Sequence, residues 1–249
     1  MVKISVVIPA FNANATIANA VLSVYNQSYP AWELIVVDDG GNEDILLPDH
    51  TGQLHAHIIR HERNKGVSAA RNTGWEHASG SFVAFLDSDD CWHPRKLEYL
   101  AQWIQGNPDA VLIGHAFDTN KATLLQQDVK PLPLVRSGIF RFLWRNRFQG
   151  SSITVRKDAP LRFDESMRFS EDFDLALQVA IHKYPVYYSA SQLTVLGRPQ
   201  LSKGGLSGNR MSMRMGELKA YRKLAKFGWF WAFFTPFLLL FSLLKHLLR

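Results

Sequence analysis

Two clusters of aspartates each follow an apolar run of the sequence, and these residues are the best suited to do chemistry. Asp38 and Asp39 follow residues 34–37, and the segment 87–90 (Asp-Ser-Asp-Asp) follows residues 82–86. Carboxylates packed this closely raise one another's pKa unless a cation neutralises them. Mg²⁺ is commonly held by one or two carboxylates together with substrate phosphates. The pattern predicts a divalent metal site; the alternative is an acidic turn whose aspartates cap helices.

A segment of small residues, 64–72 (Asn-Lys-Gly-Val-Ser-Ala-Ala-Arg-Asn), lies between the two acidic clusters. Gly66 and the small residues after it allow a helix start to approach a ligand closely, and helix starts attract anions. Lys65 and Arg71 are suited to meet phosphate or nucleotide groups. Small residues also mark tight helix packing, so the segment alone leaves both interpretations open.

Apolar runs alternate with helical patterns, and this alternation predicts the elements that position these residues. The apolar runs are typical of strands buried on both faces, as in a parallel sheet covered by helices. Ligands of such sheets bind beyond the carboxyl ends of the strands, where both acidic clusters lie. We therefore expect an α/β fold with a mostly parallel sheet. Strands are expected at residues 4–8, 34–37, 58–59, 82–86, 111–117, 151–155 and 186–189, and helices at residues 14–26, 67–77, 94–105, 171–182 and 214–226.

The composition is that of a folded, basic protein. Of 249 residues, 47% are hydrophobic and 20% charged, and the net charge is +6, which suits an anionic partner. Cys91 is the one cysteine, so we expect no intramolecular disulfide and a reducing compartment. The first residues do not resemble a secretory signal. Neither the dinucleotide-binding nor the P-loop glycine signature occurs, which argues against NAD dehydrogenases and P-loop enzymes. His55, His57 and His61 lack zinc-site spacing.

Four segments resemble the motifs of family 2 glycosyltransferases, which have the GT-A fold. They stand in the family's order and at its usual spacing: residues 5–12 (Ser-Val-Val-Ile-Pro-Ala-Phe-Asn), 36–40 (Val-Val-Asp-Asp-Gly), 64–72 and 85–90 (Phe-Leu-Asp-Ser-Asp-Asp). The resemblance implies a single GT-A domain, a Rossmann-like nucleotide-diphospho-sugar transferase, over residues 1–210. Its nucleotide-sugar-binding half would be residues 1–100 and its acceptor half residues 101–210.

The resemblance also implies roles for residues of the first half. Pro9 and Phe11 would line the nucleotide pocket, and Asp39 would accept a hydrogen bond from the base, usually uracil. Lys65 and Arg71 would lie near the donor. Asp87-Ser88-Asp89 would be the family's DxD motif, in which Asp89 ligates Mg²⁺ or Mn²⁺ and Asp87 contacts the metal or the ribose. The metal would compensate charge on the departing nucleoside diphosphate.

In the second half, the segment 170–175 (Ser-Glu-Asp-Phe-Asp-Leu) resembles the acidic motif in which the family keeps its catalytic base. This makes Asp172 the candidate base that takes the proton of the acceptor hydroxyl, with Glu171 as second choice or orienting neighbour. Ser170 is also expected to cap a helix whose acidic first turn favours the positive dipole end, and both interpretations can hold together. Downstream, Arg198 and Lys203 lie in or beside a glycine-rich stretch, where many relatives close a flexible segment over the diphosphate.

The last part of the chain, residues 211–249, combines a basic segment with an almost wholly apolar one at residues 229–244. A helix over the apolar segment is about 24 Å long, short of the ~30 Å hydrocarbon core, and Pro236 would kink it. We expect a peripheral or monotopic anchor on the cytoplasmic face of the inner membrane; a tilted transmembrane helix and a buried or oligomerising helix are the alternatives. The residues expected to meet anionic lipid headgroups are Lys219, Arg222, Lys223 and Lys226.

The activity implied by the resemblance is inverting transfer of one sugar from a nucleotide-diphosphate sugar, usually a UDP-sugar, to a hydroxyl of a sugar or lipid-linked acceptor. Its place would be cell-surface polysaccharide, lipopolysaccharide or glycolipid synthesis. The Gln-x-x-Arg-Trp motif of processive relatives is absent, which favours addition of a single sugar, and no nucleic-acid partner is expected. A nucleotidyltransferase that makes activated sugars is one alternative, but it usually has a glycine-rich loop where this chain has residues 9–14 (Pro-Ala-Phe-Asn-Ala-Asn). A non-catalytic, basic membrane-binding module is the other, and it would leave the acidic clusters unexplained.

Overall fold

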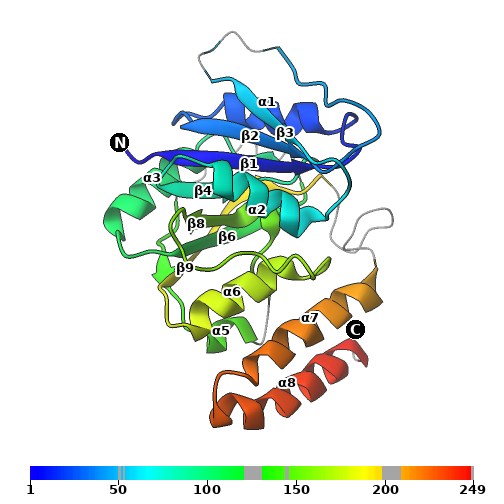
Figure 1. Ribbon diagram of the computed structural model, residues 1–249. Coiled ribbons are helices and arrows are strands. Elements are labelled where there is room, and N and C mark those ends of the chain that lie inside the picture. Colours follow the sequence, from blue (N-terminus) through cyan, green and yellow to red (C-terminus); the bar gives the residue numbers. More distant parts are fainter. Residues whose placement is uncertain (50–51, 53, 121–130, 144–145, 198–208, 248–249) are drawn as a thin grey trace.

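The computed structural model describes residues 1–49, 52, 54–120, 131–143, 146–197 and 209–247, and it contains one large sheet flanked by helices (Figure 1). The strands are β1 (Ile4–Ala10), β2 (Glu33–Asp38), β3 (Ala56–Arg60), β4 (Phe82–Phe85), β5 (Cys91–Trp92), β6 (Leu112–Asp118), β7 (Val135–Arg136), β8 (Ile153–Arg156) and β9 (Val186–Val195). The helices are α1 (Ile17–Tyr25), α2 (Val67–His77), α3 (Lys96–Gly106), α5 (Phe140–Leu143), the 3₁₀ turn η1 (Gly150–Ser152), α6 (Glu171–Ile181), α7 (Arg210–Leu224) and α8 (Trp229–Leu247).

The first half of the sheet is parallel, as the apolar runs predict. β3, β2, β1 and β4 lie side by side in that order, and each pair of neighbours is parallel. Every residue of β1 and β4 is buried, which is typical of strands covered on both faces. The carboxyl ends of these strands therefore meet at one edge of the sheet.

The second half is mixed, because β8 runs antiparallel to both of its neighbours, β4 and β6. β6 and β9 form a longer parallel pair, and β5 and β7 add two-residue antiparallel pairs to β9. The sheet is thus mixed, and its longest strand pairs are parallel, as in an α/β fold. Sequence periodicity misses β5, β7 and α5 because each is too short to show a repeat.

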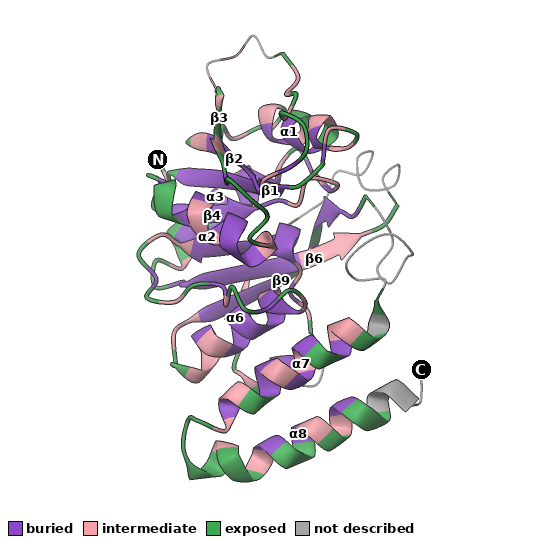
Figure 2. Cartoon of the chain, turned by 45° about the vertical axis from the view of Figure 1, so that its right-hand side comes forward, coloured by how far each residue is buried: buried purple, intermediate pink, exposed green. Residues whose placement is uncertain are grey.

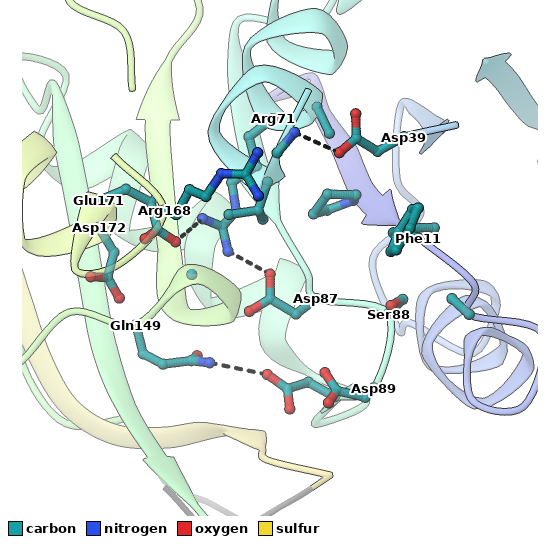
Figure 3. Close-up of a pocket in the computed structure, with 18 of the residues that line it drawn as sticks. Phe11, Asp39, Arg71, Asp87, Ser88, Asp89, Gln149, Arg168, Glu171 and Asp172 are labelled. Carbon is teal, nitrogen blue, oxygen red and sulfur yellow. Dashed lines mark hydrogen bonds and ion pairs between the residues drawn. The ribbon is translucent and has the colours of Figure 1, made fainter. Parts of the chain in front are cut away.

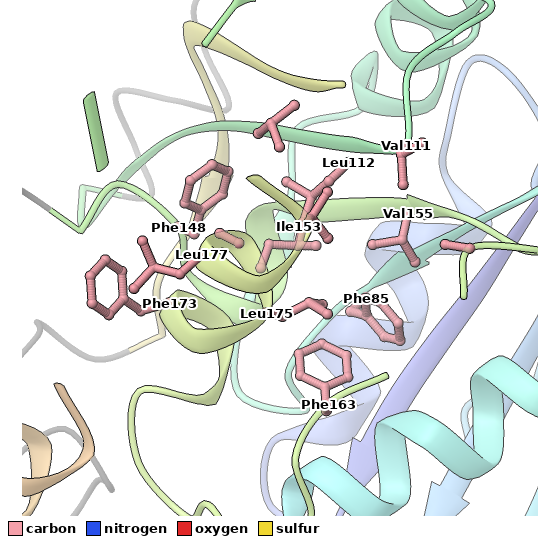
Figure 4. Packing of buried hydrophobic residues seen from close by; sticks show 14 of the residues in the cluster. Phe85, Val111, Leu112, Phe148, Ile153, Val155, Phe163, Phe173, Leu175 and Leu177 are labelled. Atoms are coloured by element: carbon pink, nitrogen blue, oxygen red, sulfur yellow. The ribbon is translucent and has the colours of Figure 1, made fainter. Parts of the chain in front are cut away.

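Two hydrophobic clusters cover the two faces of the sheet. On β1, Val7 belongs to one cluster, whereas Ile4, Val6 and Ile8 belong to the other, as expected where successive side chains point to opposite faces. α1 and α3 complete the cluster around Ile8, and α2, α6 and α7 complete the one around Val7. Figure 4 shows the second cluster between the sheet and α6.

α7 belongs to the body of the domain, beyond the boundary expected near residue 210. Its residues Ala220, Tyr221 and Leu224 are fully buried, and the Tyr221 hydroxyl donates a 2.6 Å hydrogen bond to the Leu143 carbonyl. Figure 1 shows α7 lying against α6, with α8 outside it. The division of roles between residues 1–210 and 211–249 stays a prediction.

α8 packs Leu238, Thr235 and Ser242 inward and exposes large apolar residues on its outer side. Ser242 is fully buried: its Oγ donates to Glu217 Oε2 at 3.0 Å, and its carbonyl accepts from Arg214 Nη1. Thr235 is also buried. Figure 2 shows the exposed outer side of this helix, and the exposed large residues are Trp229, Phe230, Phe233, Phe237, Leu240, Leu243 and Leu244. Within the described ranges, no helix has the length and hydropathy needed to cross a membrane.

Candidate active site

A cavity of about 670 Å³ opens at the carboxyl ends of β1, β2 and β4. Its lining comes from both halves of the chain: the segments after these strands and the start of α2 on one side, and η1, the start of α6 and Met213 of α7 on the other. Figure 3 shows the acidic residues of the two halves facing one another across this space. The cavity lies where ligands of open α/β sheets bind.

Arg71 joins the two halves of the cavity through a buried double ion pair. Its Nη2 lies 2.6 Å from Asp87 Oδ1, and its Nη1 lies 2.7 Å from Glu171 Oε1. The Arg71 side chain is 3% exposed, and burial alone would lower its pKa; the charges of the two carboxylates outweigh burial and raise the pKa above its usual value. Gly150 leaves room for the guanidinium, because an added Cβ would lie 2.2 Å from Nη2.

Asp39 anchors the segment that leads into α2. Its Oδ1 accepts from the Lys65 amide at 2.9 Å, its Oδ2 accepts from the Gly66 amide at 2.7 Å, and His61 Nδ1 lies 2.8 Å from Oδ1. Gly66 has φ +99°, a left-handed conformation suited to glycine. Asp39 therefore shapes the cavity wall, and its hydrogen bond to a nucleotide base stays a prediction. His61, which has no zinc-site spacing to the other histidines, contacts Asp39 and orients its carboxylate.

Asp90, the last aspartate of the turn after β4, holds this turn in place through hydrogen bonds. Asp90 Oδ2 accepts from Ser151 Oγ at 2.5 Å, and Asp90 Oδ1 accepts from the Gly197 amide at 2.9 Å. Ser151 Oγ also accepts from the Asp87 amide at 2.9 Å. Burial, followed by the charge of Asp87, raises the pKa of Asp90 to about 7. The third aspartate of the cluster thus fixes the turn that carries Asp87 and Asp89.

Asp87 and Asp89 both line the cavity and fit the metal that the DxD motif implies. They offer hard carboxylate oxygens at the edge of a space large enough for a diphosphate, and Mg²⁺ commonly takes one or two carboxylates plus substrate phosphates. No group of three His, Cys, Asp or Glu side chains among the described residues forms a metal cage of protein alone. The remaining ligands would therefore come from the substrate and water.

Asp172 lies at the start of α6, on the cavity side opposite the turn after β4 (Figure 3). Its Oδ1 accepts from the Phe173 amide at 2.6 Å, and the side chain is partly exposed to the cavity. Burial, followed by the negative charge of neighbouring Glu171, raises the pKa of Asp172 to about 7. A carboxylate with such a pKa is suited to accept a proton near neutral pH.

Ser170 does not cap α6 with its side chain, contrary to the expectation from sequence. Its φ is +57°, in the left-handed region, and its Oγ donates to the Met213 carbonyl of α7 at 3.0 Å. The hydroxyl is therefore engaged by a helix far along the chain, which the local pattern Ser-Glu-Asp does not reveal.

The structure brings most of the predicted site residues to the cavity and leaves others elsewhere. Lys65 is exposed and does not line the cavity, because its backbone and not its side chain faces Asp39. Arg198 and Lys203 lie outside the described residues. The predicted residues that line the cavity are Pro9, Phe11, Asp39, Arg71, Asp87, Asp89, Glu171 and Asp172.

The lining residues that sequence reasoning missed include Gln149, Arg168 and Met213. Gln149 Nε2 donates to Asp90 Oδ2 at 3.2 Å, and Arg168 is an exposed cation at the cavity edge with no ion-pair partner in the described part of the chain. All three lie on segments without a local motif. Arg168, four residues before Asp172, carries the one signal that could have found it: a cation close to the acidic motif.

The fold and the cavity define a class, the α/β transferases with a GT-A-like fold. The sequence model of Glycosyl transferase family 2 matches residues 5–165, more than half of the chain. The chain therefore belongs to glycosyl transferase family 2 and is a glycosyltransferase.

Known relatives and solved structures agree with this assignment. TuaG of Bacillus subtilis (strain 168), a glycosyltransferase named for teichuronic acid biosynthesis, is 39% identical over 52% of this chain and 50% of its own length. WfgD of Escherichia coli, a UDP-Glc:alpha-D-GlcNAc-diphosphoundecaprenol beta-1,3-glucosyltransferase, is 29% identical over 83% of this chain and 80% of its own length. The aligned stretch thus spans only half of TuaG.

Two solved structures share the fold. S. aureus TarS 1–349 matches with a TM-score of 0.69 at 18% identity, over 98% of this chain and 71% of TarS 1–349. The mannosyltransferase PcManGT from Pyrobaculum calidifontis, in complex with GDP-Man and Mn²⁺, matches with a TM-score of 0.66 at 16% identity, over 96% of this chain and 72% of that chain.

Removing the guanidinium of Arg71 should destabilise the fold strongly, because the carboxylates of Asp87 and Glu171, which are 24% and 11% exposed, would then face each other unpaired. We expect Arg71→Met to lower the free energy of unfolding by about 3–5 kcal/mol, as for other buried pairs that lose one partner. In a double-mutant cycle with Glu171→Gln, measured by denaturant unfolding, the coupling should be about 1–3 kcal/mol.

The pair Arg95–Glu98, with atoms 2.9 Å apart and side chains 39% and 27% exposed, lies nearer the surface and provides the control cycle. Arg95→Met with Glu98→Gln should give a coupling of about 0.5 kcal/mol or less, as for other surface pairs. Equal coupling energies in the two cycles would contradict a structural role for the Arg71 bridge.

Proposed function

We propose that this enzyme transfers one sugar, with inversion, from a UDP-sugar to an acceptor hydroxyl during the assembly of a cell-surface polysaccharide or glycolipid. One observation carries the proposal: Arg71 ties Asp87 to Glu171. That bridge brings the metal-binding pair Asp87 and Asp89 and the base Asp172 to a single cavity.

The proposal for the donor rests on the residues at the strand ends and is supported by the similar solved structures and relatives. Pro9 and Phe11 lie at the end of β1 and line the cavity, and the 48% exposed ring of Phe11 offers a face for a nucleobase. TarS 1–349 has been solved in complex with UDP-GlcNAc, with a TM-score of 0.69 to this chain, and the name of WfgD specifies UDP-Glc. We extend the UDP-sugar class to this chain, without a choice among sugars.

Chemically, the acceptor oxygen attacks the anomeric carbon as the bond from that carbon to the diphosphate oxygen breaks. Asp172 takes the proton of the acceptor hydroxyl, and the nucleoside diphosphate leaves on the opposite face of the sugar, which inverts the anomeric centre. Mg²⁺ or Mn²⁺ held by Asp89 and Asp87 would supply positive charge for the leaving diphosphate. Arg71 keeps Glu171 and Asp87 in place, and Asp90 holds the turn that presents Asp89.

The exposed aromatic side of α8 supports a membrane-surface location and a lipid-linked acceptor. A helix whose outer side exposes Trp229, Phe233 and Phe237 resembles an interfacial helix more than a surface helix of a soluble domain. Lys219 donates a hydrogen bond to Ser166, and Lys223 forms ion pairs with Asp164 and Asp174. The exposed basic residues left to meet lipid headgroups are therefore Arg222 and Lys226. The name of WfgD specifies a diphosphoundecaprenol-linked acceptor, and we propose this acceptor class on the cytoplasmic face of the inner membrane.

Nucleoside diphosphate release tests the reaction directly. The full chain in detergent, incubated with a panel of nucleotide sugars, a diphosphoundecaprenol-linked sugar as acceptor and Mn²⁺, should release the diphosphate from a UDP-sugar. Release should be lost with EDTA and should fall by about 100-fold or more in Asp89→Ala and in Asp172→Asn, since each removes a main catalytic contribution. Release that survives EDTA and both substitutions would contradict the proposed site.

The pH dependence of the reaction should report on Asp172. The base acts as a carboxylate, and the pKa of Asp172 is raised to about 7. Below that pKa the group is protonated, so kcat/KM should fall about tenfold per pH unit on the acid side and level off above neutrality. Glu171→Gln removes the negative charge that helps to raise the pKa, so the acid limb should move to lower pH.

An exposed carboxylate of the same type serves as the control for the pH profile. Glu165→Gln should leave the acid limb where it is in the wild type, because Glu165 is exposed and does not line the cavity. An acid limb that stays unchanged in Glu171→Gln would rule out Asp172 as the titrating base.

Vesicle flotation tests the membrane proposal. The full chain should float with vesicles that contain phosphatidylglycerol, and Phe233→Glu with Phe237→Glu should reduce the bound fraction about tenfold or more through lost apolar burial. Leu46→Glu, at a 72% exposed leucine away from α8, should bind as the wild type does. Equal binding of both variants would place the membrane contact elsewhere.

A further inference from the structure

α7 comes into backbone contact with the segment that precedes the catalytic acids. Gly216 lies in the middle of α7, and a Cβ added there would lie 2.3 Å from the Phe169 carbonyl oxygen and 2.8 Å from its carbon. Those atoms are backbone, so the contact has no flexible side chain to yield. Glycine is unfavourable inside a helix, and its presence here allows the close approach.

Ser170, the next residue, has a backbone conformation that needs support. Its φ of +57° is in the left-handed region, which residues other than glycine seldom adopt. Its Oγ donates to the Met213 carbonyl at 3.0 Å, and the same Oγ lies 3.1 Å from the Cβ position of Gly216. The turn at Ser170 is therefore held by one helical turn of α7, from Met213 to Gly216.

The turn at Ser170 sets the direction in which α6 begins. The Ser170 carbonyl accepts from the Asp174 amide at 3.0 Å, which closes the first turn of the helix. Glu171 and Asp172 lie within that turn. Glu171 is fixed independently by Arg71, whereas the Asp172 carboxylate accepts a hydrogen bond from the adjacent Phe173 amide. The position of Asp172 in the cavity thus depends on the backbone that α7 holds.

We propose that α7 positions the catalytic base, and that Gly216 and Ser170 are positioning residues for Asp172. The inference rests on the proposed role of Asp172 as the base and adds that α7 determines how Asp172 is oriented. Displacement of the Phe169–Ser170 backbone would move Asp172 away from the acceptor hydroxyl. Binding at the carboxyl ends of β1, β2 and β4 would be spared, because Arg71 anchors Glu171 and Asp87 separately.

Gly216→Ala in the full chain is the direct test. We expect kcat for nucleoside diphosphate release to fall about 10- to 100-fold, as for other small displacements of a catalytic group. The Kd for UDP in the presence of Mn²⁺ should stay within about twofold of the wild type, because the donor half is not displaced. Amide hydrogen exchange over residues 170–174 should become faster, and exchange over α2 should not change.

Gly106→Ala is the control, since Gly106 is the last residue of α3 and an added Cβ there meets no atom within 4 Å. It should match the wild type in kcat, UDP affinity and exchange. A Gly216→Ala protein with wild-type kcat and wild-type exchange would overturn the inference, and so would a loss of UDP affinity as large as the loss of kcat.

Ser170→Gly decides the matter if Gly216→Ala does not fold. Glycine adopts the positive φ without strain and removes only the hydrogen bond to Met213. A lower kcat with retained UDP affinity supports the inference, and an unchanged kcat overturns it. Asp172→Asn tests the proposed base separately. If this variant keeps full activity, Asp172 is not the base. If Asp172→Asn is inactive and Gly216→Ala has wild-type activity, only the positioning role of α7 is contradicted.

Discussion

The buried guanidinium of Arg71 is the interaction on which the rest of the site depends. A charge with 3% exposure is stable only when carboxylates compensate it, and here one comes from the turn after β4 and the other from the start of α6. Asp87 and Glu171 are far apart in sequence, so the ion pairs link the strand ends of the first half to the start of α6 in the second half. The shape of the cavity follows from that link.

The same arrangement leaves the cavity with an excess of negative charge. Arg71 compensates Asp87 and Glu171, while Asp89, Asp90 and Asp172 remain near them, and the pKa values of Asp90 and Asp172 are raised to about 7 as a result of burial and neighbouring charge. Such a site attracts a cation, and a bound cation in turn attracts a diphosphate. The charge of the cavity and the fold therefore both support the proposed nucleotide-sugar donor with a bound cation.

The sequence predicts the strands and helices around the site well, because their buried faces leave clear periodic patterns; α2 spans residues 67–77 as expected. Local patterns do not reveal which distant segments meet. Tertiary packing creates the contact of Ser170 with Met213, the hydrogen bond between Asp90 and Ser151 and the position of Arg168. The sequence therefore predicts a capping role for Ser170 and does not reveal the roles of Asp90 and Arg168. Lys65 was placed at the donor, but Asp39 binds its backbone and its side chain lies outside the cavity lining.

The outward aromatic side of α8 has a consequence for the behaviour of the purified protein in water. The row that includes Trp229, Phe233 and Phe237 is an exposed apolar surface, and in water two copies can bury it against each other. The apparent molecular mass in detergent-free buffer should then depend on protein concentration and fall when detergent is added. An oligomer seen only without detergent would thus reflect burial of this apolar surface.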